Sequence, residues 1–307
     1  MSSCLFYGGE TVDELYKWVR DDSDAVNIKN ELESMWKLFK PFADRDFKKS
    51  IRDNFVSSLW EMYLAASLLK MEFTLLPRDT HSPDICLDLG DSKCWIECVM
   101  PTAGEGDDKI PERKIGEGGI VPEREITLRF TNSITGKAQK FSEYVEKGIV
   151  DQNDLKMIAV NGGLISKRAA FFSLGLYLYK CLYGVGDLFV TYDRQTGETS
   201  EPRWNRRSNF EKASGQQVGT RLFGSLDFQD ISAVLYASST TSFPYKYGHD
   251  LVMHHNPLAT NPTKVGFLQH GLDFYVDKPS GYIRYNDRSG LVDEHGDYFV
   301  LYKMGKP

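Results

Sequence analysis

The first part of the chain repeats apolar residues with the period of a helix. Apolar side chains recur at three- and four-residue steps over 11–40, which predicts a helix there, with an interruption expected at 22–24. Pro41 should end this helix, because proline lacks the backbone N–H that a helix interior needs. A second helix is predicted over 46–71, and its C-terminal half is apolar almost all round, so we expect it to be buried.

The middle of the chain changes to short apolar runs that are typical of strands. We expect strands at 84–89 and 93–100, then a long loop over 101–125 that is rich in glycine and mixed charges. A helix over 125–147 and a buried strand at 156–160 follow. A strand, a helix and a second strand at this spacing favour a parallel crossover connection, and hence an α/β fold.

The last part of the chain continues the same alternation without a visible repeat or flexible linker. It predicts a helix over 167–183 and apolar strands at 187–193, 230–237 and 250–254. The 307 residues then divide into three parts. These are a helical N-terminal arm (1–45), a core (46–165) and a C-terminal elaboration that continues the same α/β domain (166–307).

Composition and charge narrow the class of protein. Apolar residues make up 41% of the chain and charged residues 26%, values typical of a globular domain. No apolar run reaches the roughly 20 residues that a membrane-spanning helix needs, and no signal peptide is apparent, so we expect a soluble cytoplasmic protein. The net charge of -6 argues against a general polyanion-binding surface, although a local basic patch would be enough to bind nucleic acid.

Several common site motifs are missing from the sequence. No cysteine belongs to a CxxC pair, and Cys94 and Cys98 fall on one predicted strand among apolar neighbours, so we expect reduced cysteines that pack as small apolar side chains. The glycine-rich segments lack the Lys-Ser/Thr of a phosphate-binding loop, and no Gly-x-Ser-x-Gly elbow of a serine hydrolase occurs.

One stretch of the chain, 201–221, is locally basic. It carries Arg203, Arg206 and Arg207, and aromatic side chains alternate with these arginines. Two interpretations stay open: a loop that contacts the phosphates of a nucleic acid, or an ordinary solvated surface loop. Lys140, on the helix predicted in the middle of the chain, is a further candidate for a nucleic-acid contact.

Three acidic residues stand where an acid is costly to bury. Glu61 lies in the most apolar part of the second predicted helix, Asp84 opens the first predicted strand, and Glu97 lies inside the second strand. Buried carboxylates need a partner, and one divalent cation can satisfy several of them at once. The alternative is that these carboxylates belong to unrelated salt bridges.

The turn between the two predicted strands decides which residues face one another. If Gly90-Asp91 forms a two-residue type II′ turn, Asp84 faces Glu97 across the hairpin. Residues directly opposite each other point to the same face, with Cβ atoms about 5 Å apart. Two carboxylates at that distance repel each other unless one is protonated or a metal ion bridges them.

This arrangement resembles the PD-(D/E)xK nuclease superfamily, which has the restriction-endonuclease-like fold. The matching residues are Glu61 on a helix, Pro83-Asp84 on a strand, and Ile96-Glu97 on the strand across the hairpin. The resemblance covers 55–161 of the chain. It implies an α/β core with a mixed central sheet flanked by helices, which the helical N-terminal arm and the C-terminal elaboration would extend.

The resemblance also implies a function, that of a Mg²⁺-dependent DNA endonuclease. Asp84 and Glu97 would hold Mg²⁺, for which Mn²⁺ would substitute, and Glu61 would orient a metal-bound water or hold a second ion. A lysine would assist the attacking water. RNA stays open as a substrate beside DNA, and cutting both strands of a duplex generally requires two active sites, which favours a homodimer.

One position departs from the superfamily pattern. The residue two after the motif glutamate is usually a lysine, and here it is Val99. Either a lysine from another element takes over, or the chain is a catalytically inactive nuclease-fold protein that acts as a nucleic-acid-binding or interaction subunit. For the first alternative we predict Lys137, which lies beside the apolar stripe of the 125–147 helix and can reach inward along its apolar stem. Lys140 is the second choice.

Overall fold

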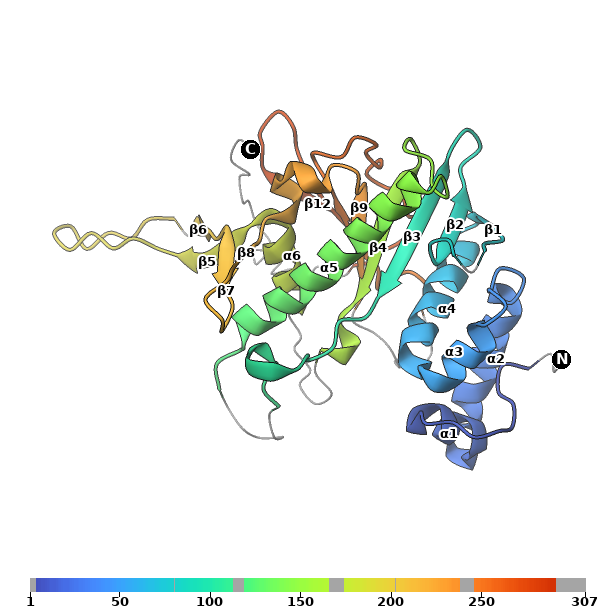
Figure 1. Ribbon diagram of the computed structural model, residues 1–307. Helices are drawn as coiled ribbons and strands as arrows, with labels where there is room; N and C mark the ends of the chain where they lie inside the picture. Colours follow the sequence, from blue (N-terminus) through green and yellow to red (C-terminus); the bar gives the residue numbers. More distant parts are fainter. Residues whose placement is uncertain are drawn as a thin grey trace.

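An eight-stranded mixed sheet runs through the molecule in the order β1-β2-β3-β4-β9-β10-β11-β12 (Figure 1). The computed structural model describes residues 4–79, 81–112, 119–165, 174–201, 203–237 and 246–290. The strands of the sheet are β1 (Thr74–Leu76), β2 (Ile85–Asp88), β3 (Lys93–Val99), β4 (Leu155–Asn161), β9 (Ala233–Ala237), β10 (Val252–His255), β11 (Leu272–Val276) and β12 (Ile283–Asp287).

Helices pack on both faces of this sheet. They are α1 (Glu14–Asp21), α2 (Val26–Phe39), α3 (Phe47–Asp53), α4 (Phe55–Lys70), α5 (Glu123–Glu146) and α6 (Leu174–Tyr183). Along β3, Ile96 packs into a core shared with α1 to α4, whereas its neighbour Trp95 packs into a core shared with α5 and α6. Because successive side chains of a strand point to opposite faces, the two cores lie on opposite sides of the sheet.

The predicted α/β fold, with a mixed central sheet flanked by helices, is confirmed. β3 and β4 pair in parallel and α5 connects them, as expected of a crossover connection. β2 and β3 are antiparallel, as are β9 and β10, which makes the sheet mixed. Of the strands after 166, β9 to β12 join the central sheet, whereas the strands between them and α6 form two small separate sheets.

The prediction of one helix over 46–71 is wrong, because two helices meet at Asn54. This residue leaves the helical region, with φ -141° and ψ 65°. Asp13 Oδ2 accepts a hydrogen bond from the Phe55 N–H at 2.9 Å and so satisfies the first turn of α4 from a distant part of the chain. The expected interruption at 22–24 is confirmed, because a short 3₁₀ turn separates α1 from α2.

The strand predicted at 187–193 differs from the observed strand in its bounds and in the sheet to which it belongs. It begins earlier, as β5 (Val185–Phe189), and pairs with β6 (Arg203–Arg206) in a hairpin outside the central sheet. A second small hairpin joins β7 (Asn209–Glu211) and β8 (Gln217–Gly219). The helix predicted over 167–183 is described from Leu174 onward, and its first part lies outside the described residues.

Two simpler expectations can be compared with the described residues. The five cysteines are free, and Cys94 is buried, as expected of a reduced cysteine that packs as a small apolar side chain, whereas Cys98 is only half-buried. No helix in the described part of the chain is both long and apolar enough to cross a membrane.

Candidate active site

The hairpin of β2 and β3 has the predicted register. Ile85 lies opposite Ile96, and Gly90 in the turn has the positive φ, 86°, that the predicted turn requires. One position further along, the same register places Asp84 opposite Glu97. Asp84 directly precedes β2 and Glu97 lies in the C-terminal half of β3, so the register is the one predicted for this pair of carboxylates.

Glu97 is fully buried, and one face of α5 supplies its hydrogen-bond donors. Lys137 Nζ lies 2.5 Å from Glu97 Oε2, and Lys140 Nζ lies 3.0 Å from Oε1. The hydroxyl of Tyr144 donates to Oε1 at 2.8 Å. Residues three and four apart share a face of a helix, so all of these donors point to one place. A buried carboxylate stays charged only when such partners replace water.

Asp84 stands next to this cluster and shares Lys137 with it. Its Oδ2 accepts the backbone N–H of Cys98 at 2.7 Å and lies 4.0 Å from Lys137 Nζ. The ammonium group of Lys137 therefore lies between the two carboxylates. Burial and the nearby charge of Glu97 raise the pKa of Asp84 above its ordinary value.

Glu61 reaches the same region from α4 and has a different cation as its partner. Arg78 Nη2 lies 2.6 Å from Glu61 Oε1 and 3.2 Å from Asp44 Oδ2. Burial, together with the charge of Asp84, raises the pKa of Glu61 to about 8, although Arg78 opposes this shift.

Sequence reasoning missed two of these partners. Arg78 follows the short strand β1, in a segment with no periodic pattern that could have placed it beside α4. Tyr144 was within reach of the helix pattern, because it lies one turn after Lys140 on the same face of α5. Its hydroxyl could have been considered as a partner for a buried acid.

A cleft of about 300 Å³ opens above this cluster. It is lined by Ser57, Ser58, Trp60, Glu61, Asp84, Cys98, Val99, Met100 and Lys137. Three of the four predicted catalytic residues thus line one cleft, and the fourth, Glu97, lies beneath it with no exposed surface. Val99 lines the cleft at the position where the superfamily pattern would place a lysine.

The donor set at Asp84 and Glu97 fits a small, hard cation. Among the described residues, no group of three or more His, Cys, Asp and Glu side chains could hold a metal ion. Mg²⁺ is, however, usually bound through one or two carboxylates, while water and substrate phosphates complete its coordination. The two carboxylates, both oxygen donors, therefore match Mg²⁺ or Mn²⁺ better than a metal that prefers sulfur or nitrogen.

The predicted nucleic-acid contacts do not gather at this cleft. Arg203 and Arg206 are exposed on β6. Arg207 lies 2.6 Å from Glu123 at the start of α5 and also pairs with Asp187, so its charge is already compensated. Lys137 lies about 20 Å further along α5 than Glu123. Of the four residues predicted to contact nucleic acid, the structure brings only Lys140 to the carboxylates.

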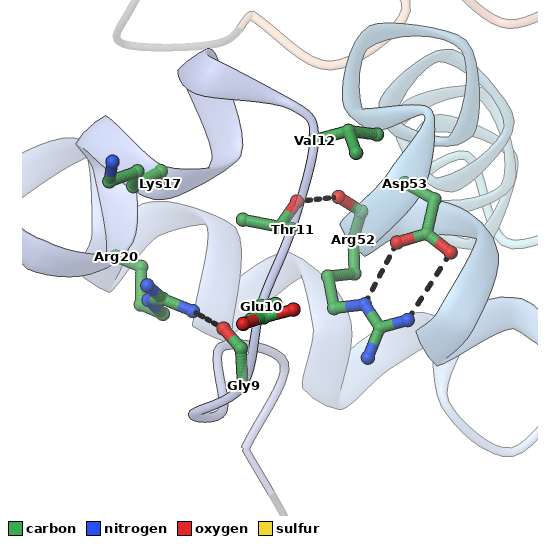
Figure 2. Close-up of a pocket in the computed structure, with 8 residues that line it drawn as sticks. All are labelled: Gly9, Glu10, Thr11, Val12, Lys17, Arg20, Arg52 and Asp53. Carbon is green, nitrogen blue, oxygen red and sulfur yellow. Dashed lines mark hydrogen bonds and ion pairs between the residues drawn. The ribbon is translucent and has the colours of Figure 1, made fainter.

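A second hollow, of about 830 Å³, lies in the helical N-terminal part of the chain (Figure 2). Arg20 and Arg52 line it, but Arg20 pairs with Asp21 at 2.7 Å and Arg52 pairs with Asp53 at 2.9 Å. Figure 2 shows the guanidinium of Arg52 turned onto Asp53. Because neighbouring carboxylates already neutralise these arginines, we place the candidate chemistry in the smaller cleft.

The raised pKa of Glu61 predicts how stability depends on pH when divalent cations are removed with EDTA. The folded protein binds this proton more tightly than the unfolded chain, so the wild type should lose stability as the pH rises from about 5 to about 8. Replacing Glu61 by Gln removes this proton. The stability of Glu61→Gln relative to the wild type should therefore increase with pH, by up to about 1.4 kcal/mol per pH unit.

Urea unfolding at several pH values measures this difference. Glu143→Gln is the control, because Glu143 is on α5 with 62% of its side chain exposed. Its stability relative to the wild type should change little over the same range. If the difference between Glu61→Gln and the wild type were flat, or fell with rising pH, the Glu61 carboxyl would not hold its proton in this site.

Comparisons with known proteins assign no family to the chain. It matches no family model, and neither a curated protein nor a solved structure matches it significantly. The chemistry of the cleft therefore has to be inferred from the residues that line it.

Proposed function

We propose that this chain is a metal-dependent nuclease that hydrolyses phosphodiester bonds in DNA, with a core related to the restriction-endonuclease-like fold. The observation that carries the proposal is the meeting of Asp84 and Glu97 with Lys137 at one cleft. The superfamily pattern needs two carboxylates and a lysine, and Val99 cannot supply the lysine. Lys137 supplies an ammonium group from a neighbouring helix.

Each residue has a distinct role in this proposal. Asp84 and Glu97 would hold Mg²⁺ or Mn²⁺, which would supply Lewis-acid stabilisation and a more acidic water there. Lys137 stabilises the negative charge that develops on the phosphate and on the attacking oxygen. Glu61, kept in place by Arg78, accepts a hydrogen bond from the water and orients it for attack.

The position of the arginines suits a long substrate rather than a small phosphodiester. Arg207, the residue after β6, pairs with Glu123 at the start of α5, and Lys137 lies about 20 Å further along the helix. A duplex of roughly six base pairs covers that distance, given a rise of about 3.4 Å per step. A DNA or RNA strand cut at the cleft could therefore contact both places, and cutting both strands of a duplex would require a homodimer.

A second candidate function is that of a nuclease-fold protein without catalysis, which binds nucleic acid or acts as an interaction subunit. The observation that favours it is Val99, an apolar side chain that lines the cleft where a lysine is expected. Lys137 and Lys140 would then serve only to neutralise Glu97.

Plasmid nicking separates the two candidates. The wild type should nick supercoiled DNA in Mg²⁺ or Mn²⁺ but not in EDTA. Lys137→Met should lower the rate at least about a hundredfold, the order expected on losing a group that stabilises charge in the transition state. Lys147→Met is the matched control, because Lys147 follows the end of α5 with 62% of its side chain exposed. It should keep the wild-type rate.

Two outcomes would change the assignment. Nicking by Lys137→Met at the wild-type rate would remove Lys137 from the mechanism. A wild type that binds DNA but nicks none in either metal would favour the second candidate, the binding subunit.

Salt dependence tests the predicted nucleic-acid contacts. Binding of a fluorescent duplex is measured by anisotropy in EDTA, so that no cleavage occurs. Arg203→Glu and Arg206→Glu should each weaken binding and lower the slope of log K against log salt by about 0.9, the value for one lost phosphate contact. Lys278→Glu, at an exposed lysine in the turn between β11 and β12, makes the same charge change elsewhere and should leave the slope unchanged. If all variants had the same slope of log K against log salt as the wild type, the arginines of β6 would make no phosphate contact and would belong to the ordinary solvated surface.

A further inference from the structure

One ammonium group occupies the space between the two carboxylates assigned to the metal ion. Lys137 Nζ lies 2.5 Å from Glu97 Oε2 and 4.0 Å from Asp84 Oδ2. A divalent cation bound to the same oxygens would stand within a few ångströms of this positive charge. Repulsion at such a distance is strong in a poorly hydrated site. The ammonium group of Lys137 therefore opposes the binding of an ion to the same two oxygens.

We propose that Lys137 and the divalent cation compete for one place between Asp84 and Glu97. Without metal, the lysine closes the site as an internal counter-ion. With a divalent cation bound there, the ammonium group of Lys137 would move into the cleft, where it could act on the substrate. This inference rests on the proposed function, because it assumes that these two carboxylates hold the ion.

The other contacts of Glu97 hold its carboxylate in position when Lys137 moves away. Its Oε1 accepts from Lys140 at 3.0 Å and from the Tyr144 hydroxyl at 2.8 Å. Lys140 also lies 3.2 Å from Oε2, but Lys137 makes the shorter contact there. When Lys137 leaves, Oε2 loses its shorter contact and keeps only the longer one to Lys140, while Oε1 remains anchored to α5. Lys140 and Tyr144 are thus positioning residues for Glu97.

The cleft offers a place for the displaced ammonium group. Lys137 already lines it, with 21% of its side chain exposed. Glu61 from α4 and Asp84 also line this cleft, so its walls are polar on the side of Lys137. A lysine has a flexible apolar stem and a strongly hydrated ammonium group, so a move from Glu97 toward the cleft needs only side-chain rotation.

Metal affinity tests this proposal. If Lys137 competes with the ion, removing the lysine should raise the affinity for Mn²⁺; if Lys137 instead supports the metal site, removing it should lower that affinity. Mn²⁺ binding is measured by electron paramagnetic resonance or calorimetry, without substrate. Lys137→Met should bind Mn²⁺ about tenfold more tightly than the wild type, because the ion no longer has to break a charge-assisted hydrogen bond. Tyr144→Phe, which removes an anchor of Glu97 but no charge, should bind more weakly. Lys140→Met should gain less than Lys137→Met, because it loses an anchor together with a charge.

Two results would overturn the competition. Unchanged or weaker binding by Lys137→Met would show that the lysine supports the metal site rather than blocking it. An equal gain in Mn²⁺ affinity in Lys137→Met and Lys140→Met would show that any lost positive charge helps the ion to bind, and that Lys137 and the ion do not compete for one position. In either case, metal-dependent nicking by the wild type would leave the proposed function standing, whereas a wild type that binds neither Mg²⁺ nor Mn²⁺ would overturn both.

Lysine reactivity in the wild type provides a measurement that does not depend on a folded variant. The protein is treated briefly with an amine-acetylating reagent, with and without Mn²⁺, and each lysine is quantified by mass spectrometry. Metal should raise the acetylation of Lys137 severalfold and leave that of Lys140 unchanged, since only Lys137 is released from Glu97. An equal reactivity of Lys137 in both conditions, at saturating metal, would contradict the displacement.

Discussion

The buried charge of Glu97 is the constraint on which the rest of the site depends. A carboxylate without exposed surface costs several kcal/mol unless donors replace its water, and here the donors come from one face of α5. The interaction ties α5 to β3, and α5 is also the crossover that leads to β4. The position of the crossover helix therefore determines the electrostatics of the site, because Lys137, Lys140 and Tyr144 of this helix supply the donors to Glu97.

The same constraint explains why the carboxylates of the cleft have cations as neighbours. Glu97 and Asp84 share Lys137, while Glu61 is paired with Arg78. Each carboxylate thus has a cation beside it, yet burial still raises the pKa of Glu61 and of Asp84. A cation close to such carboxylates favours their charged form and opposes this rise in pKa.

The features that could be predicted from the sequence are those encoded in local pattern. The hairpin register followed from the turn at Gly90, and the reach of Lys137 toward the core followed from its place beside an apolar stripe. The features that could not be predicted depend on contacts between distant segments. Asp13 caps the helix that begins at Phe55, so the break between α3 and α4 has no local signal. Arg78 joins the site from an irregular segment, and β5 and β6 form a hairpin outside the central sheet.

Diffraction from crystals grown with Mn²⁺ tests the central claim, that a buried carboxylate pair with an exchangeable lysine forms a metal site. An anomalous difference map locates Mn²⁺ independently of any activity. The account predicts a peak within bonding distance of Asp84 and Glu97, with Glu97 Oε1 still held by Lys140 and Tyr144 and with the ammonium group of Lys137 moved into the cleft. A map without a peak at this pair, in which Lys137 still bridges the two carboxylates at saturating Mn²⁺, would contradict it.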